Sequence, residues 1–228
     1  MKMAYLRLHI DAPLTETDTP YLRGFFGNAF RDIPLFHHHL DETGYLYVYP
    51  RIQYKIIGGD PLLVGIAEGV SALQKAIDAL DHLRINGTVH AIKETTFSQT
   101  IFEPKPTAAM REYTFVTPWL ALNQRNTRLY NELHEHAERK NLLNSILVAN
   151  ILSFCKGVGI VCRKRLEAHS HLDATTHQFK RIPMTAFSGS FRVNFLLPDL
   201  IGIGKAVSFG NGTIRRAGMR DDVHESHN

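Results

Sequence analysis

The sequence of residues 187–216, FSGSFRVNFLLPDLIGIGKAVSFGNGTIRR, predicts two strands joined by a glycine-rich loop. Apolar side chains recur at even spacing in its first nine residues, which is typical of a strand with one buried face. These side chains are Phe187, Phe191, Val193 and Phe195. Pro198 ends the strand, a glycine-rich loop follows, and Thr213 and Ile214 begin a second short strand. We predict that the phenylalanines form a core face and do not stack on bases.

The loop between these strands carries four glycines and one lysine. Glycine adopts positive φ and lets the backbone approach a ligand closely, and main-chain amides outside a regular ladder can point at phosphate oxygens. The basic pair Arg215 and Arg216 follows the second strand. We therefore predict a phosphate-binding loop. Its residues are Gly202, Gly204, Lys205, Ser208, Gly210 and Gly212.

Two common nucleotide-binding motifs do not fit this loop. A P-loop requires a glycine where this chain has Asp199, and a Ser or Thr where it has Ala206. A dinucleotide-binding fingerprint requires a helix after the glycines, but here a strand is predicted. The loop therefore belongs to neither class of nucleotide-binding site.

The segment GIGKAVSFGNG, with a strand on each side, resembles the glycine-rich loop of the CRISPR-associated endoribonucleases that cut precursor CRISPR RNA, in the RAMP superfamily. That loop is often written G-x-G-x-x-x-S-x-G-F-G, and this chain departs from it at Asn211. A weaker resemblance covers residues 21–55. The resemblance implies an α+β fold with tandem ferredoxin-like domains, and RNA cleavage. It also implies that the glycine loop binds RNA.

Composition predicts a soluble, cytoplasmic globular protein. The 228 residues are 44% hydrophobic, which is enough for one large domain or two small ones. No apolar run approaches the length of a membrane span, and the first residues alternate like a strand and lack a signal-peptide core. The two cysteines, Cys155 and Cys162, are predicted to be reduced thiols.

Positive charge is concentrated in the second half of the chain. Residues 116–220 contain 15 Lys and Arg against six Asp and Glu, whereas residues 1–115 contain 11 against 13. Basic residues gain affinity for nucleic acids by releasing counterions from phosphates. We predict RNA contacts at Arg163 and Lys164, on a hairpin that also bears Lys180. A solvated basic face is the alternative interpretation.

The order of predicted elements indicates two domains and a tail, at residues 1–108, 109–216 and 217–228. In the first domain we predict a helix that begins at Asp18 or Thr19, with Pro20 in its first turn, and a second helix. The second helix spans residues 71–83, and the strands span 3–12, 45–49, 51–57, 62–66 and 88–102. In the second domain we predict helices at 126–140 and 142–155, and strands at 111–122, 163–172, 176–183 and from 185 onward.

RNA can be cut without a metal ion if a base removes the proton of a 2′-hydroxyl, a cation stabilises the phosphorane-like charge, and an acid protonates the leaving oxygen. Histidine suits both proton transfers because its ordinary pKa is about 6.5. The resemblance implies catalytic histidines at or just after the first helix, with a tyrosine nearby. That place in this chain holds His37, His38 and His39, followed by Tyr45, Tyr47 and Tyr49.

We assign roles on this basis. If residues 37–39 are extended, His37 and His39 share one face while His38 faces away, and His37 or His39 acts as the base or the acid. Tyr47 positions the phosphate or the 2′-hydroxyl. The candidates for the charge-stabilising cation are Lys55, Arg31 and Arg23.

The remaining histidines lack the ligand spacing of a zinc site, and we predict neither a metal nor another cofactor. The expected partners are CRISPR repeat RNA, other CRISPR-associated proteins and a second copy of the chain in a homodimer. Two alternatives stay open. The chain could be a non-catalytic RNA-binding subunit of a CRISPR ribonucleoprotein complex, or a metal-dependent phosphoesterase, although it lacks the carboxylate-rich centre of such enzymes.

Overall fold

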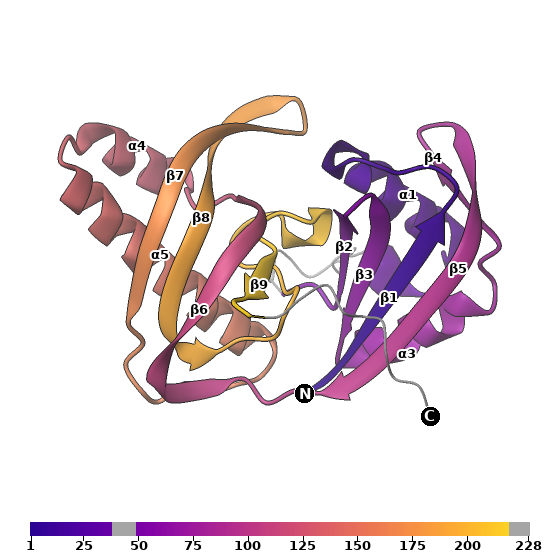
Figure 1. Cartoon of the computed structure of the whole chain (residues 1–228), viewed down its shortest axis with the longest axis horizontal. Helices are drawn as coiled ribbons and strands as arrows, with labels where there is room; N and C mark the ends of the chain where they lie inside the picture. The colour runs from indigo at the N-terminus through magenta and orange to yellow at the C-terminus, as the bar shows by residue number, and fades with distance from the viewer. Residues whose placement is uncertain (38–48, 219–228) are drawn as a thin grey trace. The chain divides into compact units, whose positions relative to one another are not determined.

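The computed structural model describes residues 1–37 and 49–218 (Figure 1). The chain divides into two compact units. The N-terminal unit comprises Met1–Pro104, Ser153–Val161 and Ala206–Asn211, and the C-terminal unit comprises Lys105–Leu152, Cys162–Lys205 and the residues from Gly212 onward. The domain limits at residues 108 and 216 stay a prediction.

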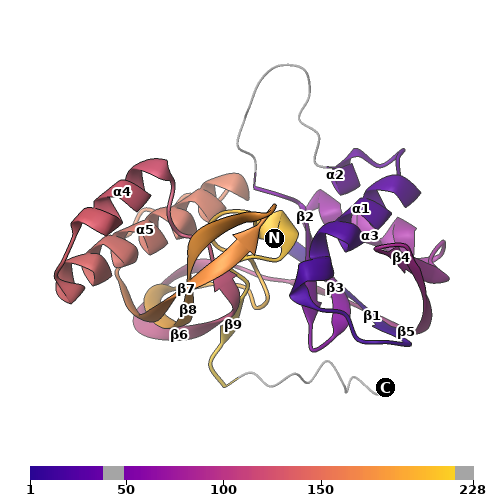
Figure 2. The ribbon, with the colours of Figure 1, turned by 90° about the horizontal axis from the view of Figure 1, so that it is seen from above.

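The N-terminal unit is built on a five-stranded antiparallel sheet with the order β2-β3-β1-β5-β4. Its strands are β1 (Lys2–Ile10), β2 (Ile52–Ile57), β3 (Asp60–Ile66), β4 (His82–Ile85) and β5 (Thr88–Ile101). Its helices are η1 (Glu16–Asp18), α1 (Thr19–Ala29), α2 (Pro34–His37) and α3 (Glu68–Ile77). Figure 2 shows α1 and α3 on the same side of this sheet.

Helix α1 forms where the sequence predicts it. Asp18 occupies the N-cap position and Pro20 lies in the first turn, while Leu22 and Phe26 are completely buried. Helix α3 is shorter than predicted. Backbone bonds of 3.2 Å from Ala79 N to Ala76 O and from Leu80 N to Ile77 O tighten its end, so the predicted last residue of the helix, Leu83, lies in β4. The apolar spacing extends beyond the end of the helix because apolar side chains of the next strand are buried in the same core.

The C-terminal unit contains a four-stranded antiparallel sheet with the order β7-β8-β6-β9. Its strands are β6 (Lys105–Trp119), β7 (Ala168–Phe179), β8 (Ile182–Leu196) and β9 (Ile214–Arg216). Figure 2 shows α4 (Gln124–Glu132) and α5 (His136–Gly157) on one side of the sheet. The predicted apolar face of β8 is confirmed, since Phe187, Phe191 and Phe195 are each at most 1% exposed.

The turn between β7 and β8 is not where the sequence predicts it. Its two central residues, Lys180 and Arg181, both have positive φ, 51° and 65°. A two-residue hairpin turn of this kind normally has Asn or Gly at these positions. Lys and Arg gave no turn signal, so the predicted hairpin of 163–172 and 176–183 was wrong. Lys164 lies before β7, and only Lys180 lies on the hairpin.

The predicted helix limits in the second half are also wrong. The break lies between Glu132 and His136, whereas the sequence predicts it at Asn141. Arg139 donates from Nε to the Leu133 carbonyl, 2.8 Å away, and so satisfies an acceptor in the break. Asn141 stays helical because tertiary packing of α5, with Leu147 and Ile151 completely buried, overrides its low helix propensity.

Candidate active site

His37, one of the three predicted catalytic histidines, is the last residue of α2. Its carbonyl accepts a 3.0 Å hydrogen bond from Arg23 Nη2 in α1, and the Phe36 carbonyl accepts one of 3.1 Å from the buried Tyr54 hydroxyl in β2. The end of α2 is therefore fixed to both elements. Because His37 is helical, the alternation expected for an extended segment does not begin there. His38, His39 and Tyr47 lie outside the described residues.

Aromatic packing explains why this short helix forms. The Phe36 ring lies 5.7 Å from that of Phe26 and 5.1 Å from that of Phe30, and Phe26 also packs on Tyr54 at 5.9 Å. Aromatic pairs at such separations contribute beyond the area they bury. Phe36 itself is only 1% exposed. A four-residue helix with little stability of its own is thus anchored beside the candidate histidine.

Arg23 connects His37 to the tip of the glycine loop within the N-terminal unit. Its guanidinium lies 4.5 Å from the ring centre of Phe209, which is in η2 (Val207–Phe209). Partial burial lowers the pKa of Arg23 from its ordinary value. Its Nε is buried, with no hydrogen-bond partner among the residues that the structure describes. One cation therefore contacts two segments that are far apart in the sequence.

Tyr54 is a residue of this site that the sequence prediction missed. Burial raises the pKa of its hydroxyl, and nearby Arg23 lowers it to a smaller extent. The hydroxyl is therefore protonated near neutral pH and serves as a donor to the Phe36 carbonyl. Alternation along β2 does not single out Tyr54, because five consecutive residues of this strand are buried and no polar face is apparent.

Lys55, a predicted charge stabiliser, is completely buried. Its Nζ donates to Gln53 Oε1 at 2.9 Å, and Gln53 Nε2 donates to the Tyr49 hydroxyl at 2.7 Å. Burial lowers the pKa of Lys55 to about 7 and raises the pKa of Tyr49. The loop tip packs on this strand, since a Cβ at Gly210 would lie 3.5 Å from Lys55 Cα. The electrostatic role of Lys55 stays a prediction.

Arg31, the other predicted charge stabiliser, is placed differently. Its side chain is exposed just after α1, where Nη2 lies 3.5 Å from Asn28 Oδ1. The guanidinium of Arg31 is therefore accessible to solvent, and its charge-stabilising role stays a prediction.

The glycines at the ends of the loop are packed inside the C-terminal unit. A Cβ at Gly212 would lie 2.0 Å from the Ile203 carbonyl oxygen, and one at Gly204 would lie 2.5 Å from Trp119 Nε1. Gly202 forms an isolated bridge with Thr213 and is buried. Ser208 and Gly210, in the loop tip, are buried as well. These positions shape the loop, and contact of these residues with RNA stays a prediction.

Lys205 fixes one end of the loop. Its Nζ donates to the Leu122 carbonyl at 2.7 Å and its backbone N–H donates to Leu120 at 3.2 Å. Partial burial lowers the pKa of its ammonium group. The residue is half-buried, so it is less accessible than a surface lysine.

The other predicted RNA-binding residues lie in two places. Arg163 and Lys164 are exposed in the segment between α5 and β7. Arg215 and Arg216 lie in β9 near Asp199, whose Oδ1 accepts a 2.9 Å bond from the Arg216 backbone. Burial raises the pKa of Asp199, and both arginines oppose this shift. The first pair is therefore the more accessible of the two.

No group of three or more His, Cys, Asp or Glu side chains is arranged to hold a metal ion within residues 1–37 and 49–218. In the same ranges, none of the helices is long and apolar enough to cross a membrane.

Family models match both halves of the chain. The Cas6b N-terminal domain matches residues 1–103, and the Cas6b C-terminal domain matches residues 105–217. A crystal structure of Cas6b is 32% identical, with a TM-score of 0.86 over 95% of this chain and 100% of that chain. The chain belongs to the Cas6b family. The predicted family resemblance and the tandem ferredoxin-like α+β fold are thereby confirmed.

Two further relatives extend the Cas6b comparison. A crystal structure of the CRISPR RNA processing endoribonuclease Cas6b is 29% identical, with a TM-score of 0.75 over 95% of this chain and 100% of that chain. An uncharacterized protein of Methanocaldococcus jannaschii is 39% identical over 108 residues, which cover 47% of this chain and 73% of that protein.

Proposed function

We propose that this chain cuts CRISPR precursor RNA within its repeats, without a metal ion, by attack of a 2′-hydroxyl on the adjacent phosphate. The observation that carries the proposal is the match of both halves to Cas6b, together with the similarity to a CRISPR RNA processing endoribonuclease along nearly the whole chain. As a member of this family, the chain is an endoribonuclease.

The proposed reaction consumes no water. The 2′-oxygen forms a bond to phosphorus while the bond from phosphorus to the 5′-oxygen breaks. A base takes the proton of the 2′-hydroxyl and an acid gives a proton to the leaving 5′-oxygen. The products are a 2′,3′-cyclic phosphate and a 5′-hydroxyl.

Within this proposal, His37 or His39 is the base or the acid, and His38 is the third candidate. The fixed position of the His37 backbone supports this assignment, because a general base must be held within hydrogen-bond reach of its proton. Arg23 is a positioning residue that holds the end of α2. Tyr47 orients the phosphate, and Arg31 or Lys55 stabilises the developing charge. Arg31 is favoured by its exposure.

RNA binding is assigned mainly to the C-terminal unit. The accessible cations Arg163 and Lys164 contact phosphates, whereas Lys205 holds RNA at the glycine loop. Several backbone N–H groups of that loop already donate to carbonyls of this chain, so the contribution of loop amides is restricted to those outside this set. Arg215 and Arg216 add positive charge beside that loop. The glycines keep the loop in the shape that this binding requires.

The test is cleavage of an end-labelled repeat RNA in EDTA by the wild type and by a variant with alanine at His37, His38 and His39. His177→Ala is the matched control, because His177 is a partly exposed histidine outside the candidate site. We expect the wild type and the control to cut at one site and the triple variant not to cut. Undiminished cutting by the triple variant would contradict the assignment. Activity only with added Mg²⁺ would contradict metal independence.

A further outcome separates the alternative function. If the wild type does not cut but binds repeat RNA in a salt-sensitive manner, and Lys205→Ala weakens that binding, the chain is an RNA-binding subunit. Circular dichroism of each variant checks that its fold is retained.

A further inference from the structure

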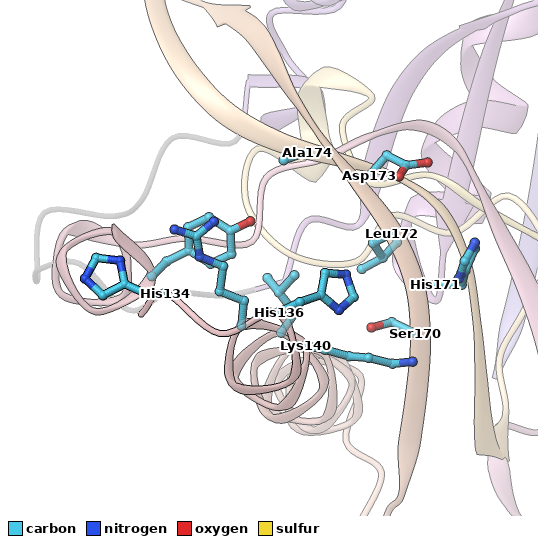
Figure 3. Close-up of a pocket in the computed structure, with 11 residues that line it drawn as sticks. His134, His136, Lys140, Ser170, His171, Leu172, Asp173 and Ala174 are labelled. Carbon is cyan, nitrogen blue, oxygen red and sulfur yellow. The ribbon is translucent and has the colours of Figure 1, made fainter. Parts of the chain in front are cut away.

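A pocket of about 320 Å³ lies in the C-terminal unit, between the turn that joins α4 to α5 and the edge strand β7. None of the residues that line it belongs to the candidate active site or to the glycine loop. Figure 3 shows His136 and Lys140 extending from α5 toward Ser170 and His171 of β7. Ligand pockets begin at about 300 Å³, so this one has room for a small ligand or a single nucleotide.

Charge and donor chemistry point to an anion. Lys140 and Arg139 are basic side chains in the lining, and His134, His136 and His171 add ring N–H donors. The histidines do not form a metal site with Asp173, because no suitable group of ligands occurs in the part of the chain that the structure describes. Lysine and arginine are the side chains that most often bind phosphate oxygens.

The walls of the pocket are held in place before any ligand binds. Arg139 donates from Nε to the Leu133 carbonyl at 2.8 Å, and its guanidinium lies 5.0 Å from the Tyr130 ring centre. Tyr130 in turn packs edge-on against Phe187, with ring centres 5.5 Å apart. Across the pocket, Ser170 donates from Oγ and from its backbone N–H to Asn144 Oδ1. A fixed guanidinium loses little entropy on binding.

The lining favours a phosphate that carries a sugar. Leu143, Leu172 and Tyr130 offer apolar surface to ribose carbons. Asp173 repels a phosphate but accepts hydrogen bonds from ribose hydroxyls. In Figure 3, Lys140 extends from α5 toward β7, while Asp173 lies farther along β7 with its carboxylate turned away from α5, at the edge of the pocket. A ligand with its phosphate at Lys140 and its sugar toward Asp173 satisfies both charged groups.

We propose that this pocket binds one ribonucleotide of the RNA through its phosphate, as a contact additional to the active site and the glycine loop. The assignment of RNA as the source rests on the proposed function. A free ribonucleoside monophosphate presents the same chemistry, so the experiment separates the two sources.

The first measurement is binding of a repeat RNA with a 2′-deoxy nucleotide at its cleavage site, by fluorescence anisotropy. Lys140→Gln removes the charge from the pocket, and Lys93→Gln removes one exposed lysine from β5 as the matched control. We expect Lys140→Gln to weaken RNA binding about fivefold or more and to reduce the salt slope by about one. The control should weaken binding less than twofold.

The second measurement is titration of the wild type and Lys140→Gln with adenosine 5′-monophosphate and with inorganic phosphate. If Lys140→Gln leaves RNA binding intact but abolishes monophosphate binding, the source is a free nucleotide and the RNA assignment is overturned. If Lys140→Gln and Lys93→Gln change RNA affinity equally and the wild type does not bind the monophosphate, the pocket is not a binding site and the proposal is overturned. If the nuclease proposal fails, the wild type does not cut repeat RNA. The titration with the monophosphate still tests the pocket in that case.

Discussion

In the N-terminal unit, Lys55 is completely buried and Arg23 is half-buried, whereas in the C-terminal unit Arg163 and Lys164 are exposed. The enclosed groups have well-defined partners, such as the His37 carbonyl for Arg23. The exposed groups are placed to bind a polyanion. Under the proposed function, the N-terminal unit fixes chemical groups in place and the C-terminal unit provides RNA affinity.

The glycine loop has residues in both units. Its tip, Ala206–Asn211, belongs to the N-terminal unit, and its two ends belong to the C-terminal unit. Phe209 in the tip contacts Arg23, while Gly204 and Gly212 at the ends pack closely around Trp119. A motif that resembles a phosphate-binding loop thus also has a packing role in each unit. Substitutions that affect one of these contributions and not the other test the difference between the two units.

The largest expected effect is the loss of stability in Gly212→Ala. The new Cβ would lie 2.0 Å from a backbone oxygen, at a φ of +64°. We expect a loss of about 3–5 kcal/mol in urea denaturation, from steric overlap and the left-handed backbone together. Gly218→Ala is the matched control, since φ is +83° and no atom lies within 4 Å. It should lose only about 1 kcal/mol. Equal losses would contradict the packing role.

The next effect concerns the buried Lys55. Its pKa is about 7 in the folded protein and 10.5 ordinarily, so between these values the unfolded chain binds more protons. Stability therefore rises with pH across this window, by at most about 1.4 kcal/mol per pH unit, and is lower at pH 7 than at pH 10. Lys55→Met should remove this slope in denaturation at several pH values, and exposed Lys93→Met should retain it. A wild type without the slope would show that Lys55 is hydrated.

A smaller effect is expected on the cleavage rate in Arg23→Met. The variant loses the hydrogen bond to His37 and the contact with Phe209, so we expect the maximum rate to fall about tenfold or more, with less than a twofold change in RNA affinity. Single-turnover kinetics and binding measurements separate the two. Arg84→Met, at an exposed arginine of β4, is the control. A change in RNA affinity with an unchanged cleavage rate would show that Arg23 contributes to RNA binding and does not position His37.

The smallest effect is expected for the double variant Arg163→Gln/Lys164→Gln. Loss of two phosphate contacts should weaken RNA binding several-fold and reduce the salt slope by about two, with an unchanged rate at saturating RNA. Arg125→Gln/Arg128→Gln on α4 removes two exposed charges from the same unit as a control. If both double variants weaken binding equally, net charge and not position determines affinity.

The features that were predicted correctly from the sequence depend on residues close to one another along the chain. The buried face of β8 and the short strand after the loop follow from local alternation and glycine positions. The first helix follows from Asp18, Pro20 and the apolar spacing after them. These signals act within a few residues and do not require knowledge of the tertiary structure.

Tertiary features account for the remainder. The contact of Arg23 with Phe209 joins distant segments that have no common sequence pattern. The burial of Lys55 could not be predicted from the sequence, because alternation indicates which residues share a face of a strand but not whether other elements cover that face. The turn at Lys180 and Arg181 has positive φ at residues that rarely adopt it. Each of these positions contributes to the proposed site or to the predicted RNA-binding surface.

The most direct test of the central claim is the chemistry of the cut. A repeat RNA with a single 2′-deoxy nucleotide at the scissile position removes the proposed nucleophile and keeps every phosphate. We predict that the wild type binds this RNA as tightly as the unmodified RNA but does not cut it, and that the unmodified RNA gives a 2′,3′-cyclic phosphate. Cutting of the deoxy substrate at the same site would contradict attack by the 2′-hydroxyl and the histidine roles built on it.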